Sequence, residues 1–376
     1  MISVNLLTSI TQIDEHQWNE IVVPNRLICR HSYLRAVESS QINQCRYYYP
    51  IVVEDGQILA HACLYTITTE LDSFARGALK RLITLIRRRW PNFMVLHSLE
   101  CGTPVALGNT FSFRAGADRA KLMEALVNAT ESLAAKLGIH VLLFRDFQDE
   151  DAGWAEPLCT FGYSRIQNLP CARLNLRWKS FDEYLQAMRS EYRSKLLATT
   201  KKGQDTGVTL TEESDFAKYA PQLAQLWRQA YDHAQEYRRE MLLEDFFRNV
   251  HLHLGPKTSI IAARKQEQLI GFLLLFLDDE TLTTIFSGLD YSQSRETGVY
   301  FNMFYFAVDL AIQRGFKEID FGITTLAPKL DLGAVAVPLF MYMKHRHPIL
   351  NRIVPQIFAR MTPPAPLQRR NVFKKE

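Results

Sequence analysis

The sequence predicts an α/β fold in which a mixed, largely antiparallel sheet flanked by helices occurs twice. Three observations carry this prediction. Strand-like runs alternate with long helices that stop at glycine, two regions repeat the same order of elements, and 47% hydrophobic with 22% charged residues is the composition of a folded chain. At 376 residues the chain has room for two domains of ordinary size.

The repeat is a charged hairpin turn, an apolar strand, a further strand, a long helix ending in glycine, and a last strand. Hairpin and helix lie at 52–65 and 118–137 in the first copy, and at 262–276 and 300–314 in the second. The separation from Leu59 to Gly138 is 79 positions, whereas the matching separation from Leu269 to Gly315 is 46. The first copy therefore contains an insertion of 33 residues.

A basic helix lies inside that insertion. The stretch DSFARGALKRLITLIRRRWP at 72–91 contains six cations, and no acid occurs between Asp72 and Glu100. Its apolar residues recur at helical spacing, which predicts a basic amphipathic helix. Such a helix fits an anionic membrane surface or RNA phosphate, or packs on its own domain with a solvated basic face. We expect a domain over 1–170 with a basic insertion at about 72–100, and a second domain over 171–376.

In the first domain, apolar and β-branched runs predict strands over 1–7, 46–53, 58–66, 105–113 and 139–144. Asp55 and Gly56 between two of these runs are a hairpin signal. Apolar residues at helical spacing predict helices over 11–21, 30–39 and 118–137. Gly138 ends the last of them.

In the second domain the same patterns predict strands over 171–176, 208–210, 258–263, 268–277, 281–288, 317–321 and 335–343. They predict helices over 181–188, 216–235, 242–252 and 300–314. Ser180 and Glu183 form a capping-box pair at the start of the first of these helices. Residues 295–298 are expected to form a tight connection, and Lys329 to lie in a loop.

Composition and cysteine usage narrow the class of protein. The net charge of +4 is mild and does not by itself indicate nucleic-acid binding. The six cysteines are scattered without a C-x-x-C pair, as in proteins with reduced, buried thiols. The His-x-His pairs at 251/253 and 345/347 have no further ligands at a recognised spacing, so no metal site is expected.

The termini and hydropathy predict a location. The N-terminus carries Asp14 and Glu15 and no basic region, and no run of about 18 apolar residues occurs. We therefore expect a cytoplasmic protein, or one held at the inner face of the membrane through 74–90.

The segment 281–333 is the strongest candidate for chemistry. It reads as a strand, a glycine-bearing connection, a helix and a second strand. The first amides of a helix have no partner within the helix, so such a junction fits an anion. An ordinary βαβ unit without chemistry explains the segment equally well.

Three local features resemble a known family. They are the basic helical stretch YRSKLLATTKKGQDTGV, the strand, connection and helix at 286–313, and Ile319, Asp320, Phe321 and Gly322 followed by Lys329. Together they resemble the GNAT-superfamily acyltransferases, in particular the tandem FemAB-like and BioF2-like (CelD-type) branch. The resemblance covers 170–350, and reaches the first domain only through the repeat. It implies two tandem GNAT-like domains, of which the second is the catalytic one.

The resemblance also implies a donor site. The family's cofactor loop, [QR]-x-x-G-x-[GA], matches RETGVY at 295–300, which makes Arg295, Gly298 and Val299 candidate cofactor-binding residues. Tyr300 replaces the final small residue and would crowd a coenzyme A diphosphate. The expected co-substrate is therefore an acyl-CoA, an acyl carrier protein thioester or an aminoacyl-tRNA, with no tightly bound cofactor. Arg193 and Lys195 are further candidates for an anion-binding face, or belong to a solvated helix surface.

Three residues are candidates for catalysis of amide formation. Asp320, at a strand end, is expected to be a base or an anchor for the amine, or else a capping acid. Lys329 is expected to hold a phosphate or carboxylate, or to be a surface lysine. Tyr300 is expected to protonate the leaving group, or to be a core aromatic residue.

The resulting functional hypothesis is transfer of an acyl group from a thioester to an amine-bearing small molecule or envelope precursor. Two alternatives stay open. One is a FemX-type aminoacyl-tRNA-dependent aminoacyltransferase, and the other is a non-catalytic GNAT-like scaffold.

Overall fold

The computed structural model describes residues 2–70, 77–93, 95–234, 239–323, 325–361 and 370–374. The expected basic helix therefore lies partly outside the described residues, since 71–76 are not among them. The chain forms two compact units. The first contains Met1–Leu169, Gln235–Glu240 and Pro338–Pro364, and the second contains Pro170–Ala234, Met241–Val337 and Ala365–Glu376. The expected division at residue 170 is therefore incomplete, because two later segments of the sequence also belong to the first unit.

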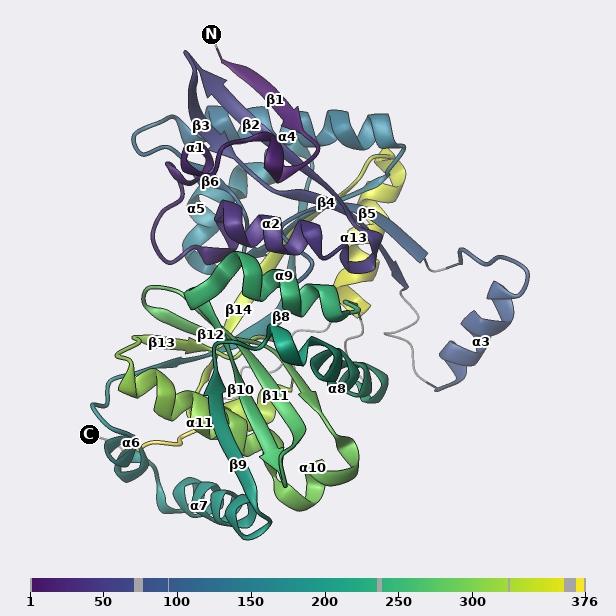
Figure 1. Ribbon diagram of the computed structural model, residues 1–376. Helices are drawn as coiled ribbons and strands as arrows, with labels where there is room; N and C mark the ends of the chain where they lie inside the picture. The colour runs from purple at the N-terminus through teal and green to yellow at the C-terminus, as the bar shows by residue number, and fades with distance from the viewer. Residues whose placement is uncertain are drawn as a thin grey trace. The chain divides into compact units, whose positions relative to one another are not determined.

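The elements of the first unit come from both ends of the chain (Figure 1). Its strands are β1 Ser3–Leu7, β2 Arg46–Glu54, β3 Gln57–His61, β4 Leu64–Glu70, β5 Val95–Cys101, β6 Ser112–Phe113, β7 Val141–Phe147 and most of β14 Val335–His345. Its helices are α1 Glu15–Asn19, α2 His31–Ser39, α3 Gly77–Arg87, α4 Arg119–Leu137, α5 Ala152–Ala155 and α13 Pro348–Met361. Asp118 caps α4 by accepting hydrogen bonds from the amides of Ala120 and Lys121.

The second unit holds the predicted hairpins. Its strands are the end of β8 Ser164–Asn175, then β9 Val208–Glu213, β10 Thr258–Lys265, β11 Gln268–Leu277, β12 Thr281–Leu289 and β13 Glu318–Asp320. Its helices are α6 Phe181–Ala187, α7 Ser190–Asp205, α8 Ala220–His233, α9 Glu244–Leu254, α10 Tyr291–Thr297, α11 Val299–Gln313 and α12 Leu326–Asp331. The predicted cap of α6 is present, because Ser180 accepts a hydrogen bond from the Glu183 amide.

The repeat is visible in the strand pairing. In the first unit β1 pairs with β2, both β3 and β4 pair with β2, β4 pairs with β5, and β5 runs parallel to β7. In the second unit β9, β10, β11, β12 and β13 pair in the same order and directions. β3 and β4 keep one register against β2, with His61 opposite Ile51 and Leu64 opposite Tyr48, so they are one interrupted strand.

The insertion in the first copy lies between β4 and β5, where 71–94 separate the two strands, whereas 278–280 separate β11 from β12. This connection carries α3.

The two halves exchange their last strands. β8 follows the first copy in the sequence, yet its Arg173 and Leu174 pair with Asp320 and Ile319 of β13 in the second unit. β14 follows the second copy, yet its Tyr342 pairs with Phe144 of β7 in the first unit. The chain therefore completes each sheet with a strand from the other half of the sequence.

We expect a fragment ending at residue 169 not to fold alone. It lacks β14, whose Tyr342 is 1% exposed and packs edge-on against Phe147 with ring centroids 5.2 Å apart, so β7 keeps an open edge. Circular dichroism and size-exclusion chromatography of the fragment, alone and co-expressed with 170–376, measure this. A full chain cut at an engineered protease site after Leu169 is the control and should stay assembled. A cooperative thermal transition of the fragment alone would contradict the expectation.

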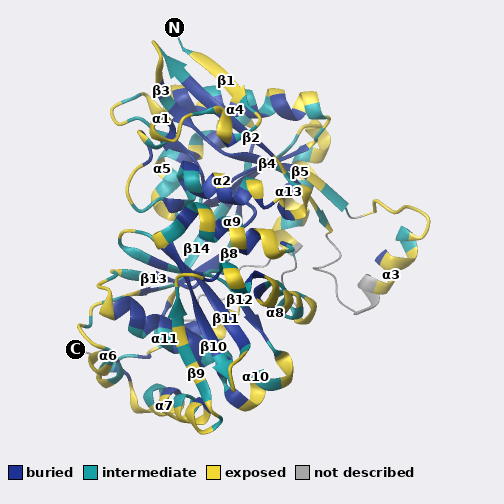
Figure 2. Cartoon of the chain, viewed as in Figure 1, coloured by how far each residue is buried: buried dark blue, intermediate teal, exposed yellow. Residues whose placement is uncertain are grey.

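Each sheet is covered by helices whose outer surfaces are exposed (Figure 2). In the second unit α11 is apolar almost all round and packs with Ile261 and Ala263 of β10 in one core. α9 covers other residues of the sheet, where Phe247 meets Phe272 edge-on at 5.4 Å between ring centroids. α8 lies so close to β12 that a Cβ at Gly288 would approach the Trp227 amide to 2.8 Å, which explains glycine there.

The structure corrects three local predictions. Residues 105–113 are not one strand, because only Ser112–Phe113 pair with β3. Residues 295–298 are not simply a tight connection, since Arg295 lies in α10 and only Gly298 separates α10 from α11. Lys329 is not in a loop but on α12. Among the helices of the described ranges, none is long and apolar enough to cross a bilayer.

Candidate active site

The parallel strands β12 and β13 part from each other in the second unit. They pair only from Thr281 opposite Glu318 to Thr283 opposite Asp320, after which β13 ends. β12 continues to Leu289, and within the described residues its later part pairs with β11 alone. Asp320 therefore stands at the point where the two strands separate.

Asp320 is 8% exposed and both its carboxylate oxygens have partners. Oδ1 accepts a hydrogen bond of 2.8 Å from the amide of Gly322, and Oδ2 accepts one of 3.1 Å from Nε of Arg173. Arg173 faces Asp320 across the β8–β13 ladder and also lies 3.7 Å from Glu318. Asp320 thus caps the loop after β13, and its charge is held in place by Arg173.

Lys329 is the most unusual titratable group of this unit, because its side chain is buried at 4% exposure. Burial lowers the pKa of Lys329 from 10.5 to about 8, although the nearby charge of Asp320 acts to raise it. Among the described residues, none forms a hydrogen bond or an ion pair with its Nζ within 4.0 Å. A lysine with this pKa is partly neutral near pH 8, so it can accept or donate a proton.

Tyr300, the third candidate catalytic residue, is linked to the helix that carries Lys329. Burial raises the pKa of its phenol to about 12, partly offset by a hydrogen bond with Thr325, the residue that precedes α12. Its ring packs on Phe304, which in turn packs on Phe321 beside Asp320. The fold therefore brings the three predicted residues Asp320, Lys329 and Tyr300 to the region around the short helix α12.

Cys171 lies in the same region and was not singled out by its sequence. It is 1% exposed, and burial with the nearby charge of Asp320 raises the pKa of its thiol to about 12. The thiol is therefore protonated, which does not suit a nucleophile. Arg173 was also missed, because it is one of several polar residues in the strand sequence SRIQNLPCARLN and no local pattern distinguishes it.

The predicted donor-binding residues lie at the junction of α10 and α11. Gly298 adopts a left-handed conformation with φ of 63°, and a Cβ there would come within 3.1 Å of the Thr199 side chain on α7. Asn302 donates to the carbonyls of Thr199 and Thr297 at 3.2 and 3.5 Å. Val299 is fully buried. α7 thus packs on this junction, so a diphosphate bound there would have to share its space.

The remaining donor candidates are arranged differently. Arg295 is exposed on α10, and its carbonyl accepts a hydrogen bond of 2.9 Å from Nζ of Lys202. Lys195, on α7, donates to Asp331 of α12 at 2.6 Å. Arg193 is half-buried and also lies on α7. The N-terminal part of α7, which carries Lys195, therefore contacts α12, the helix of Lys329. Gly298 and Arg295 instead contact residues nearer the C-terminal end of α7.

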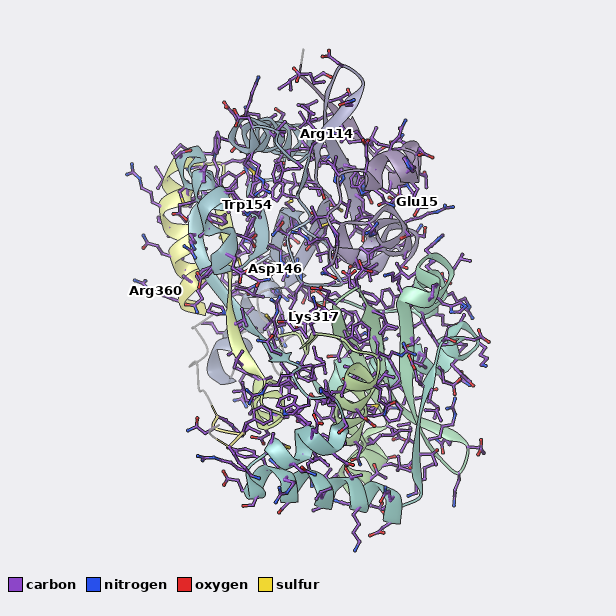
Figure 3. All side chains as sticks on the ribbon, turned by 90° about the vertical axis from the view of Figure 1, so that its left-hand side faces the viewer. Glu15, Arg114, Asp146, Trp154, Lys317 and Arg360 are labelled. Atoms are coloured by element: carbon purple, nitrogen blue, oxygen red, sulfur yellow. The ribbon has the colours of Figure 1, made fainter. Side chains whose placement is uncertain are left out.

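The first unit buries an ion network of its own. Glu100 is 2% exposed, and its Oε2 accepts hydrogen bonds from Tyr65 at 2.6 Å, Arg239 at 2.6 Å and Arg145 at 3.3 Å. Burial acts to raise the pKa of Glu100, but the charges of Arg239 and Arg145 outweigh it and hold the pKa at about 2. Asp146, labelled in Figure 3, lies 3.6 Å from Arg145. The charges of Glu100, Asp146, Arg145 and Arg239 in this network balance.

Among the described residues, no group of three or more histidine, cysteine or acidic side chains is placed to hold a metal ion.

Comparison with known proteins gives the family. The sequence profile of the FemAB-like family, described as peptidoglycan biosynthesis/recognition, matches residues 9–364. A "Putative 8-amino-7-oxononanoate synthase 2" of Mycobacterium tuberculosis is 28% identical over 321 residues, which are 84% of this chain and 42% of that protein. The chain thus spans less than half the length of this relative.

Solved structures share the fold at low identity. The C-terminal domain of a putative lysylphosphatidylglycerol synthetase from Agrobacterium fabrum has a TM-score of 0.57 at 11% identity, with 93% of this chain and 96% of that chain covered. FemX has a TM-score of 0.56 at 12% identity, with 94% and 100% covered. A tandem GNAT protein from the clavulanic acid biosynthesis pathway has a TM-score of 0.55 at 12% identity, with 93% and 99% covered.

These likenesses confirm the predicted fold class of two tandem GNAT-like domains. The profile match over nearly the whole chain shows that the protein belongs to the FemAB-like family.

Proposed function

We propose that the protein transfers an acyl group from an activated donor to an amine acceptor and forms an amide. The observation that carries this proposal is the buried Lys329 with its pKa of about 8, next to Asp320 where β12 and β13 part. Amide formation requires a group that removes a proton from the attacking amine near neutral pH. A desolvated lysine whose pKa lies close to the working pH suits that task.

Each residue then has one task. Nζ of neutral Lys329 accepts the proton as the amine nitrogen bonds to the acyl carbon. The bond from that carbon to the leaving sulfur or oxygen breaks, and the protonated phenol of Tyr300 supplies a proton to the leaving group. Asp320 is a positioning residue, because Arg173 and the Gly322 amide already occupy its oxygens and its charge acts on Lys329. Within the described residues the late part of β12 pairs with β11 alone, and the backbone groups on its other side can orient the acyl group.

The leading donor is an acyl thioester, either acyl-CoA or acyl carrier protein. A second candidate is an aminoacyl-tRNA, with an envelope precursor as the acceptor. Two observations favour the second: the FemAB-like family assignment, and the packing of α7 over the 295–299 junction where a CoA diphosphate would be expected. The synthase activity in the name of the Mycobacterium tuberculosis relative is not assigned to this chain, which matches 42% of that protein.

The two donors are distinguished by a direct assay. The purified chain is incubated with acyl-CoAs, acylated carrier protein or charged tRNA, together with amine-bearing acceptors, and amide products are measured by mass spectrometry. A product from charged tRNA alone would select the second candidate. Failure of every donor with a folded protein would instead support the non-catalytic scaffold.

Asp320→Asn should shift the pH dependence of transfer. The carboxylate raises the pKa of Lys329, so its removal lowers that pKa further, and the rising limb of the rate profile moves to lower pH than about 8. The profile of kcat/KM against pH measures the shift. Glu318→Gln is the matched control, because Glu318 is on the same strand and near Arg173 but is not among the charges acting on Lys329. An unchanged profile in Asp320→Asn would argue against Lys329 as the proton acceptor.

A further inference from the structure

Positive charge is concentrated in two segments of the sequence. Residues 73–99 contain six lysines and arginines and no acid, and residues 332–375 contain eight and no acid. The whole chain has 44 lysines and arginines and 40 acids, so the rest of the sequence carries ten more acids than cations. The net charge of +4 therefore comes from these two segments. Each contains a helix of the first unit, α3 in one and α13 in the other.

Helix α13 has two apolar faces, one packed against strands and the other exposed. Its inner face packs Val354 and Phe358 against strand residues that include Ile166 and Met343. Asn351 fixes this orientation by donating to the Gly162 carbonyl at 2.9 Å. A surface helix with a single packed face normally presents polar residues to water on its opposite face.

The outer face of α13 is aliphatic instead. Ile349, Ile353 and Ile357 follow each other at i, i+4 and i+8 and are 65%, 46% and 49% exposed. Arg346, Arg352 and Arg360 are exposed beside or along this stripe. Figure 3 shows the side chain of Arg360 pointing outward from the helix. The face thus combines a row of isoleucines with three arginines.

Helix α3 and the turn after it repeat this combination. Leu82 and Leu85 are 52% and 60% exposed, and Trp90, just after the helix, is 64% exposed. Arg81, Arg88 and Arg89 are exposed among them. Ile83 is buried and Arg87 pairs with Glu70 at 3.1 Å, whereas the leucines, Trp90 and the other arginines named above are exposed.

We propose that the outer faces of α3 and α13 dock on the surface of an anionic lipid bilayer. Aliphatic and tryptophan side chains enter the boundary between headgroups and acyl chains, while the arginines contact lipid phosphates. This inference goes beyond the proposed transfer reaction and does not depend on it.

The exposed faces of α3 and α13 fit other partners less well. RNA binds through phosphate contacts and base stacking, which leave a stripe of isoleucines without a role. A second copy of the chain meeting this face symmetrically would bring arginines against arginines, which opposes association. An anionic bilayer satisfies both the charge and the aliphatic residues.

Co-sedimentation with vesicles tests the proposal on the full chain. We expect binding to vesicles of phosphatidylcholine with 30% phosphatidylglycerol, at least tenfold weaker binding to pure phosphatidylcholine, and release by high salt, because Coulomb attraction is screened. The double variant Ile353→Glu/Ile357→Glu and the variant Leu85→Glu should each weaken binding to the anionic vesicles at least tenfold. Circular dichroism confirms that these surface variants are folded.

Leu252→Glu is the matched control, because Leu252 is an aliphatic residue of helix α9 that is 71% exposed outside both basic segments. It should leave vesicle binding unchanged. The proposal is overturned if the wild type does not bind anionic vesicles, or if the isoleucine and leucine variants bind like the control. It is equally overturned if light scattering shows a dimer that these variants dissociate, or if tRNA binding rather than vesicle binding is lost.

Discussion

Lys329→Met should stabilise the protein at pH 7 and abolish acyl transfer. The folded state holds the pKa of Lys329 at about 8, below its usual value of 10.5, so keeping the lysine charged at pH 7 costs folding free energy. At 1.36 kcal/mol for each pKa unit, the difference amounts to ~3 kcal/mol. Methionine has a similar length and no charge, so the variant recovers this stability while losing the proton acceptor.

The pH dependence gives the sign of this effect. Between about pH 8 and 10.5 the unfolded chain binds the Lys329 proton more than the folded protein does, so the stability of the wild type rises with pH in that window. Lys329→Met lacks this rise, and its advantage should shrink above pH 8. Urea unfolding at pH 7 and pH 10 measures both changes.

Lys201→Met, at an exposed position on α7, is the control and should change stability by less than about 0.5 kcal/mol at either pH. The expectation fails if Lys329→Met is less stable than the wild type at pH 7. It also fails if the variant retains transfer activity, in which case Lys329 is a burial feature and not the proton acceptor.

Glu100→Gln should cause a large loss of stability in the first unit. Glu100 is the shared acceptor for two buried arginines, so its neutral replacement leaves Arg145 and Arg239 without their central counter-charge. Removing one partner from a buried ion network typically costs ~3–5 kcal/mol. Urea unfolding near pH 7 measures this loss, and trypsin cleavage after Arg239 should accelerate because that residue loses its 2.6 Å contact.

The stabilisation by Glu100 also has a defined pH window. Its folded pKa of about 2 lies below the usual 4.5, so its contribution is present above about pH 4.5 and is lost as the pH falls towards 2. The gap between wild type and Glu100→Gln should close over that range. Glu131→Gln, which breaks a partly exposed pair with Lys344, serves as control and should cost less than about 1 kcal/mol. Equal losses in both variants would contradict the special role of the buried network.

Local signals predicted most of the second unit correctly. The strands at 258–263, 268–277 and 281–288 were recognisable because apolar runs are separated by charged turns, and Gly315 marked the end of α11. α12 was missed because LAPKLD is a single short turn with a proline. α13 was missed because it contains Pro355, which normally argues against a helix interior, and because isoleucines on its outer face obscure the helical period.

The chemistry at the site was only partly visible in the sequence. Asp320 and Lys329 were recognisable by residue type, but the burial that lowers the Lys329 pKa arises from packing between distant segments. Glu100, Arg145 and Arg239 are separated by 45 and 94 positions, and no local pattern links residues so far apart. The strand 105–113 was predicted from apolar content, yet Gly108 there has a φ of 121°, which belongs to irregular backbone.

The exchange of β8 and β14 has a consequence for synthesis of the chain on the ribosome. The first unit receives β14 only after residue 345 has been translated, although its strands β1 to β7 end at Phe147. While the intervening residues are synthesised, one edge of β7 lacks its partner strand β14. Glu100 also lacks Arg239 until that residue has been translated. Nascent chains of this length expose sheet edges that favour aggregation. The first unit should therefore depend on chaperones until β14 has been translated and can pair with β7.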